Sequence, residues 1–148
     1  MKVSIFGQGY VGFSLAASAA KAGHQVVGIE IIPELVAQLT AGKSHVEGVE
    51  LAGISNYQAT SDAAAIDGSD VVIIAVPTPL NADRKPDLSY LESTCETIAK
   101  NLKNKALIIN ESTSFPGTLR ELIAESIEKG SGLGHLYAAS PERVDPGN

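Results

Sequence analysis

The fold is decided by Lys2-Val3-Ser4-Ile5-Phe6-Gly7-Gln8-Gly9-Tyr10-Val11-Gly12, the first stretch of a 148-residue chain. A short apolar run leads into Gly-x-Gly-x-x-Gly and then into small residues, which predicts a strand, a tight turn and the first turn of a helix. Gly7 lets the chain reverse sharply, Gly9 has no Cβ to block a diphosphate, and Gly12 lets the helix lie close to its own strand. The free N–H groups at the start of that helix would face an anion. Glycine-rich turns are common, so the surrounding residues decide whether this one binds a nucleotide.

The composition excludes several classes of protein. The net charge is −6 and no face rich in Lys or Arg stands out, so we expect no nucleic-acid partner. The longest apolar run, residues 71–76, is far too short to cross a bilayer, and the N-terminus has no signal-peptide pattern. The single cysteine, Cys95, falls on the apolar stripe of a predicted helix, where we expect a buried thiol rather than a nucleophile. These features predict one soluble, cytoplasmic domain that contacts no membrane and holds no metal.

Glu30 ends the second predicted strand, about 20 residues after the glycine turn, where dinucleotide-binding folds place a carboxylate on the adenosine ribose. The next basic residue is Lys43, so the 2′-phosphate of NADP would meet a bare carboxylate. This predicts NAD rather than NADP as the cofactor. A solvated acid at a strand end is the alternative interpretation of Glu30.

Strands and helices alternate along the whole chain, which predicts a doubly wound, Rossmann-type parallel sheet with helices on both faces, in one domain over residues 1–148. Apolar runs and their flanking residues predict strands at 2–6, 26–30, 54–60, 70–76, 106–110 and 135–139. Helical periodicity and cap signals predict helices at 10–21, 33–39, 87–101 and 118–129, and a short one from Ser61-Asp62 to residue 67.

Polar motifs follow three of the later strands. They are Pro77-Thr78-Pro79, Ser112-Thr113 and Pro141-Glu142-Arg143. Because the carboxyl ends of parallel strands meet at one edge of the sheet, we expect these residues to share a ligand crevice with the glycine turn and Glu30. Thr118 is expected to cap the following helix, which leaves Ser112 and Thr113 facing the crevice.

The combination and order of these motifs resemble the N-terminal NAD-binding domain of the nucleotide-sugar 6-dehydrogenases, the family of the UDP-glucose and GDP-mannose dehydrogenases. The resemblance covers essentially all 148 residues. It rests on Gly7–Gly12, Val76–Pro79, Glu111-Ser112-Thr113 with Pro116-Gly117-Thr118, and Ser140–Val144. Arg84-x-Pro86-Asp87-Leu88-Ser89-Tyr90 and Asp145–Asn148 are similar to the branch that acts on UDP-N-acetylhexosamines.

The resemblance implies a four-electron oxidation of the sugar C6 alcohol to a carboxylate with two NAD⁺ per turnover. It assigns the diphosphate to Gly7, Gly9, Tyr10, Val11 and Gly12, and the adenosine ribose to Glu30, where the family more often has aspartate. It further implies that Pro77, Thr78, Ser112 and Thr113 line the cofactor, with Thr113 near the nicotinamide and a catalytic water. Glu142 would act on that water as a general base in thioester hydrolysis, and Arg143 would contact cofactor or substrate.

The same resemblance implies that the nucleophilic cysteine lies in a later domain, beyond Asn148. We therefore expect this chain to bind NAD(H) without turnover, as the N-terminal part of a longer, homo-oligomeric enzyme whose other domains contact the nucleotide sugar. A stand-alone module that senses NAD(H) is an alternative interpretation, and a methyltransferase with a similar glycine turn is another. The short-chain dehydrogenase pattern is excluded, because no tyrosine is followed four residues later by lysine.

Overall fold

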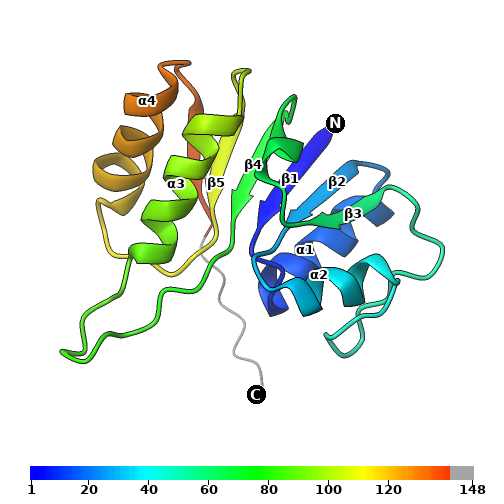
Figure 1. Cartoon of the computed structure of the whole chain (residues 1–148). Helices are drawn as coiled ribbons and strands as arrows, with labels where there is room; N and C mark the ends of the chain where they lie inside the picture. The colour runs from blue at the N-terminus through cyan, green and yellow to red at the C-terminus, as the bar shows by residue number, and fades with distance from the viewer. Residues whose placement is uncertain (141–148) are drawn as a thin grey trace.

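The computed structural model describes residues 1–140 and contains a six-stranded parallel sheet in the order β3-β2-β1-β4-β5-β6 (Figure 1). The strands are β1 (Lys2–Phe6), β2 (Gln25–Ile29), β3 (Tyr57–Thr60), β4 (Val71–Ile74), β5 (Leu107–Asn110) and β6 (Leu136–Ala139). The helices are α1 (Tyr10–Lys21), α2 (Pro33–Thr40), α3 (Ser89–Asn101) and α4 (Glu125–Ser131), with a short 3₁₀ helix η1 (Ala63–Ile66) and a π-helical segment η2 (Leu119–Ala124). The strand order reverses between β1 and β4, which is where such sheets bind their ligands.

Hydrophobic clusters lie on both faces of the sheet. On one face, alternate strand residues such as Val72 and Ile74 pack in one core with α3 and α4 side chains such as Ile98 and Ile127. On the other face, Ile5 and its neighbours pack against α1. Each strand thus presents its successive residues to different helical layers. The doubly wound sheet with helices on both faces is confirmed.

Most predicted elements are confirmed to within one to three residues, but β4 is shorter than predicted at its carboxyl end. The carbonyl of Ile74 accepts the N–H groups of Glu111 (2.9 Å) and Ser112 (3.2 Å), which come from the loop after β5. The N–H of Ala75 still donates to β1, at the carbonyl of Phe6 (2.9 Å). Beyond this point Pro77 has no N–H to continue the ladder. The strand is confirmed, and it ends two residues before the predicted residue 76.

The prediction that Thr118 caps the next helix with its side chain was wrong. The backbone of Thr118 is already helical (φ −48°, ψ −41°) and no side-chain cap hydrogen bond forms. Its hydroxyl instead donates to the carbonyl of Phe115 (2.7 Å), so the threonine closes the preceding turn. Asp87, the first residue of the predicted helix 87–101, accepts the N–H of Ser89 (3.0 Å), the residue at which α3 begins.

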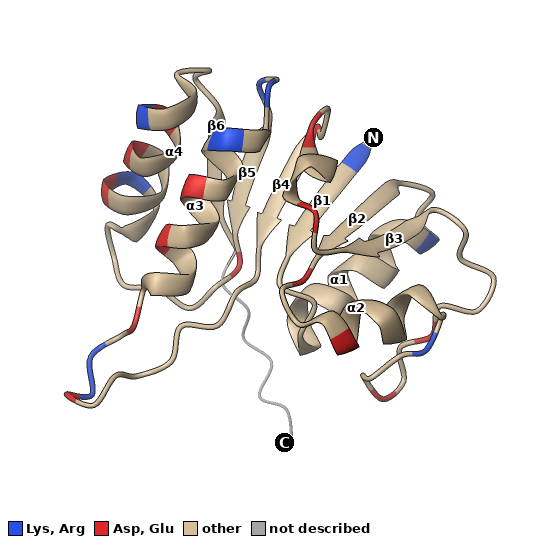
Figure 2. Ribbon diagram, in the orientation of Figure 1, with Lys and Arg blue, Asp and Glu red and all other residues tan. Residues whose placement is uncertain are grey.

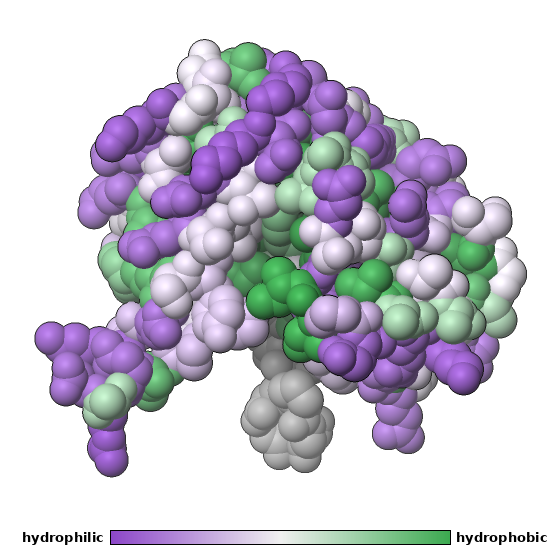
Figure 3. All heavy atoms as spheres, in the orientation of Figure 1, coloured by the Kyte–Doolittle hydropathy of each residue, from purple (hydrophilic) through white to green (hydrophobic). Residues whose placement is uncertain are grey.

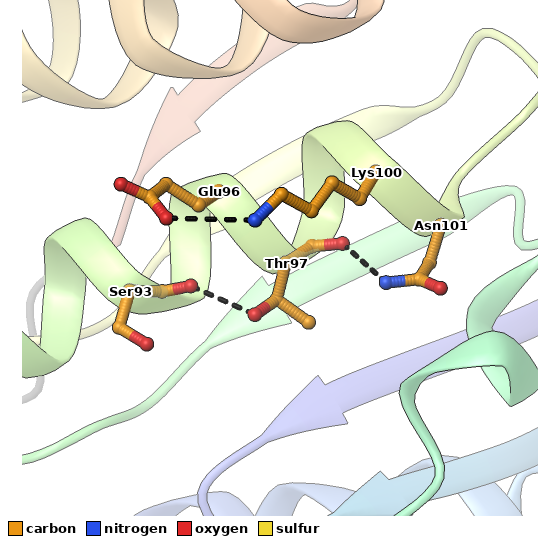
Figure 4. A network of polar contacts seen from close by, with 5 residues as sticks. All are labelled: Ser93, Glu96, Thr97, Lys100 and Asn101. Carbon is orange, nitrogen blue, oxygen red and sulfur yellow. Dashed lines mark hydrogen bonds and ion pairs between the residues drawn. The ribbon is translucent and has the colours of Figure 1, made fainter.

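The surface of the described chain is polar and of mixed charge. In Figure 2, Lys and Arg are scattered among Asp and Glu rather than gathered on one face. On α3 (Figure 4), Glu96 and Lys100 form an ion pair of 3.7 Å with both side chains mostly exposed, a type that contributes little to stability. Within residues 1–140 no helix is long and apolar enough to cross a membrane.

A buried histidine lies where β6 begins, at the opposite end of the strands from the glycine turn. The Nδ1 atom of His135 accepts the N–H of Ala106 (3.2 Å), and its Nε2 is buried without a partner among the described residues. Burial lowers the pKa of His135 below its usual 6.5, the carboxylate of Glu128 opposes this, and Lys105 adds to the lowering. Protonation would turn the Nδ1 acceptor into a donor that faces the Ala106 N–H.

We therefore expect the free energy of unfolding to fall as the pH drops below about 6.5, because the unfolded state then binds the proton that the folded state resists. Above that pH both states are neutral at His135 and this loss is absent. His135→Asn, whose Oδ1 can accept the Ala106 N–H without titrating, should remove the slope between about pH 6.5 and pH 5. Urea unfolding of both proteins across this range is the measurement, and equal slopes would contradict the assignment.

Candidate functional site

The glycine turn after β1 is built by close backbone contacts that leave no room for side chains. Gly7 has φ +82°, and a Cβ there would lie 2.5 Å from the carbonyl oxygen of Ala75. A Cβ on Gly12 would lie 1.9 Å from the carbonyl oxygen of Gly7 and 3.3 Å from the Cβ of Ala75. Gly12 therefore brings α1 against the turn itself and against the chain after β4, rather than against β1 as the sequence suggested.

Gly9 is different, because a Cβ there would lie more than 4 Å from every atom of residues 1–140 other than its chain neighbours. It is exposed and forms the N-cap of α1 without a side-chain hydrogen bond. Tyr10 and Val11 follow in the first turn of the 12-residue helix, where N–H groups have no intrahelical acceptor. The open space at Gly9 and these N–H groups form a place suited to a diphosphate.

Glu30 lies directly after β2 and reaches back toward the glycine turn. Its Oε2 accepts the N–H of Gln8 (2.9 Å), and its Oε1 accepts the N–H groups of Ile31 (2.8 Å) and Ile32 (3.1 Å). The residue is only 7% exposed, so the alternative of a solvated acid is wrong. A carboxylate offers about four acceptor positions, and three are engaged here. One remains for a ribose hydroxyl, and accepting a second hydroxyl would displace an N–H group.

A cavity of about 470 Å³ joins these features, a volume in the range of small-molecule sites. Gly7, Gly9 and Glu30 line it, together with Pro77 from the loop after β4. Its other walls come from the ends of β1 and β2, the chain after β4, the aliphatic side chains before and at the start of α2, and a face of α3; these residues are Phe6, Ile29, Ala75, Val76, Ile31, Ile32, Leu35, Tyr90, Ser93 and Thr94. Figure 3 shows the corresponding apolar surface in the middle of the visible face, between the α3 and α2 halves.

Ser112 does not face the crevice as the sequence suggested. It is buried, and its hydroxyl donates to the carbonyl of Val76 (2.8 Å), beside Pro77. The hydroxyl thus ties the loop after β5 to the loop after β4. Ser112 positions the chain that walls the cavity, whereas Thr113 is exposed and Thr78 is half-buried, and neither lines it.

The predicted site residues fall into three groups in the structure. Gly7, Gly9, Glu30 and Pro77 share the cavity, with Tyr10, Val11 and Gly12 in the helix turn beside it. Thr78, Ser112 and Thr113 lie in the loops that continue the same edge of the sheet. Glu142 and Arg143 lie outside the described residues.

Sequence reasoning missed the walls that α2 and α3 contribute. Ile31 and Ile32 are aliphatic and adjacent yet 74% and 51% exposed, and both line the cavity. Tyr90, Ser93 and Thr94 belong to a helix whose sequence pattern indicated only its core stripe. Gly28 interrupts the apolar strand β2, and a glycine inside a strand indicates that other atoms approach its backbone closely.

The strand order, the glycine turn at the switch point and the carboxylate after β2 define a Rossmann-type dinucleotide-binding domain. The model of the UDP-glucose/GDP-mannose dehydrogenase family NAD-binding domain matches residues 1–148. The chain belongs to this family and forms its NAD-binding domain.

Individual relatives agree with this assignment. The chain is 37% identical to UDP-N-acetyl-D-mannosamine dehydrogenase of Pyrococcus horikoshii, in a match that covers 99% of this chain and 37% of that protein. It is 36% identical to UDP-N-acetyl-D-glucosamine 6-dehydrogenase of Pseudomonas aeruginosa, which it covers to 36%. A ternary complex of GDP-mannose dehydrogenase from Pseudomonas aeruginosa superimposes with a TM-score of 0.90 at 29% identity, over 98% of this chain and 37% of that one. The chain thus spans little more than a third of the length of these relatives.

Proposed function

We propose that this chain is the cofactor-binding part of an enzyme that oxidises the C6 alcohol of a UDP-sugar to a carboxylate with two NAD⁺. The observation that carries the proposal is the single cavity in which the glycine turn, the free start of α1 and Glu30 meet. Two of the relatives in sequence are named as UDP-N-acetylhexosamine dehydrogenases, and these names support a UDP-sugar substrate. The rest of the substrate site and a homo-oligomeric interface would belong to further domains of such an enzyme.

The chain's own residues would divide the work along the sheet edge. Gly9 and the N–H groups of Tyr10 and Val11 would hold the diphosphate, and Glu30 would accept a ribose hydroxyl. Pro77 and Thr78, in the loop that Ser112 positions, would lie beside the nicotinamide half of the cofactor. The bound NAD⁺ would accept a hydride there. Thr113 would hold the catalytic water, Glu142 would remove its proton as a general base, and Arg143 would contact cofactor or substrate.

Calorimetric titration of the 148-residue chain with NADH tests this proposal. We expect NADH to bind, and NADPH to bind at least about tenfold more weakly, because its 2′-phosphate would lie against the Glu30 carboxylate. Mixing the chain with NAD⁺ and UDP-N-acetylglucosamine should give no NADH absorbance at 340 nm, since the proposed nucleophile belongs to another domain.

Each outcome has a distinct meaning. Absence of NADH binding, or equal binding of NADPH, would contradict the cofactor assignment. NADH production by the chain alone would contradict the division of labour. A longer form of the protein that binds NADH but oxidises no nucleotide sugar would instead favour the NAD(H)-sensing module.

A further inference from the structure

The middle residue of the glycine turn, Gln8, carries a primary amide that is fully buried beneath the turn. Its Nε2 donates to the carbonyls of Ile5 (3.0 Å) and Gly7 (3.2 Å). Its Oε1 accepts the hydroxyl of Tyr57 (2.8 Å). A buried amide requires such partners, and here both N–H bonds return to the strand end and turn that carry it. Gln8 therefore holds the Gly7 peptide from below.

Tyr57 brings the third of these contacts from β3, 49 residues along the chain. Its ring packs edge-on against Phe13 of α1, with 6.0 Å between ring centroids. Burial and the charge of Glu30 both raise the pKa of Tyr57, so the phenol keeps its proton. The hydrogen bond consequently runs from Tyr57 to Gln8 and is held in place by the packing of α1 on the sheet.

Gly28 of β2 provides the space in which the two side chains meet. A Cβ at this position would lie 2.4 Å from the Oε1 of Gln8 and 2.8 Å from the hydroxyl of Tyr57. Its backbone does not adopt a positive φ, so the glycine is required for space rather than for conformation. Strands β2 and β3 are thus shaped around the pair.

The pair also connects the two halves of the cofactor site. The main-chain N–H of Gln8 donates to Glu30, while its side chain holds the carbonyl of Gly7, the same carbonyl against which Gly12 packs. A shift of Gln8 would move the diphosphate turn and the ribose acceptor relative to each other. Both are walls of one cavity, so such a shift would alter its geometry.

We propose that Tyr57 is a positioning residue that acts through Gln8. It fixes the position of the glycine turn relative to Glu30, as binding of the adenosine-diphosphate half of the dinucleotide requires. This inference rests on the proposed function. It gives β3 a role in cofactor binding although no residue of β3 lines the cavity.

Tyr57→Phe is the direct test, because it removes one hydroxyl and leaves the ring packing against Phe13. We expect NADH and ADP-ribose to bind about tenfold more weakly. The buried Gln8 oxygen loses its donor, so the Gln8 side chain shifts and moves the glycine turn relative to Glu30. Titrations at a temperature where each variant is fully folded exclude loss of folded protein as the cause. Unchanged affinity in a folded Tyr57→Phe protein would overturn the inference while leaving the proposed function intact, and a wild-type chain that binds no NADH would overturn both.

Tyr137→Phe is the matched control. It removes a hydroxyl that donates to Glu128 (2.8 Å) at the start of β6, away from the cavity. We expect this variant to be less stable than the wild type but to bind NADH within about twofold of it. An equal loss of affinity in both variants would mean that general destabilisation, not positioning, weakens binding.

The double variant Gln8→Leu/Tyr57→Phe distinguishes two roles of the Tyr57 hydroxyl. One is to position the glycine turn through Gln8, and the other is only to supply a hydrogen bond to a buried amide oxygen. The double variant has no amide oxygen left without a donor, but the carbonyls of Ile5 and Gly7 lose the Nε2 donor, so we expect it to be less stable than the wild type. Its NADH affinity should remain about tenfold low, because no side chain then holds the Gly7 carbonyl. Recovery of affinity together with stability would overturn the positioning role. The variant also provides the test if Tyr57→Phe fails to fold.

Discussion

Replacing Gly9 by alanine is expected to weaken NADH binding by about fiftyfold or more while leaving the domain at least as stable as before. Gly9 has φ −69° and ψ −164°, which any residue can adopt, and in the described part of the chain a Cβ there meets no atom within 4 Å apart from its chain neighbours. The added methyl group would instead occupy the space proposed for the diphosphate. Alanine in a compatible conformation also restricts the unfolded chain, which raises stability by about 0.4–1 kcal/mol.

Two measurements on the same Gly9→Ala protein check this expectation. Calorimetry with NADH reports the affinity, and urea unfolding reports the free energy. Normal NADH affinity would show that the diphosphate does not approach Gly9, and would contradict the proposed function directly. A large loss of stability would contradict the open environment of the residue.

Gly12→Ala should behave in the opposite way and lower the free energy of unfolding by about 3 kcal/mol, the upper end of the range for overpacking a closed interior. Its Cβ would lie 1.9 Å from the carbonyl oxygen of Gly7, a backbone atom that a change of side-chain rotamer cannot move. Either α1 must shift away from the turn or the turn must open. Both responses disturb the start of α1, so NADH affinity should fall as well.

Urea unfolding measures this loss, with Ser18→Ala as the control in the same helix. Ser18 is exposed and its hydroxyl bonds only to the carbonyl of Ser14 in the preceding turn (2.8 Å), so its replacement should change stability by less than about 0.5 kcal/mol. A Gly12→Ala protein as stable as Ser18→Ala would contradict the close packing at this glycine.

The sequence predicted some properties of Gly9 and Gly12 correctly and others incorrectly. Their spacing predicted the turn and the helix start, and both were confirmed. Gly12, however, was assigned to packing against β1, whereas it packs against the Gly7 carbonyl and the chain after β4. That chain is more than sixty residues away, so its approach depends on how β4 adds to the sheet beside β1.

The strand ends were the least predictable part of the site. A continuous apolar run predicted β4 as far as residue 76, because hydrophobicity does not indicate where hydrogen bonding to a neighbour stops. In the structure β4 ends at Ile74, whose carbonyl accepts the N–H groups of both Glu111 and Ser112, and Pro77 has no N–H with which to continue the ladder. The same loop turns the Ser112 hydroxyl inward, onto Val76, and away from the crevice.

The sequence by itself determined the class of sheet, the glycine turn, the carboxylate after β2 and the family, because each follows from local spacing or from periodicity along one element. Only the tertiary structure decided that the Glu30 carboxylate accepts three backbone N–H groups and that residues of α2 and α3 line the cavity. It also decided that the Tyr57 hydroxyl donates to Gln8 in the space that Gly28 leaves free. These contacts join residues from different strands and helices. Their geometry depends on the twist and packing of the whole sheet, which no local pattern records.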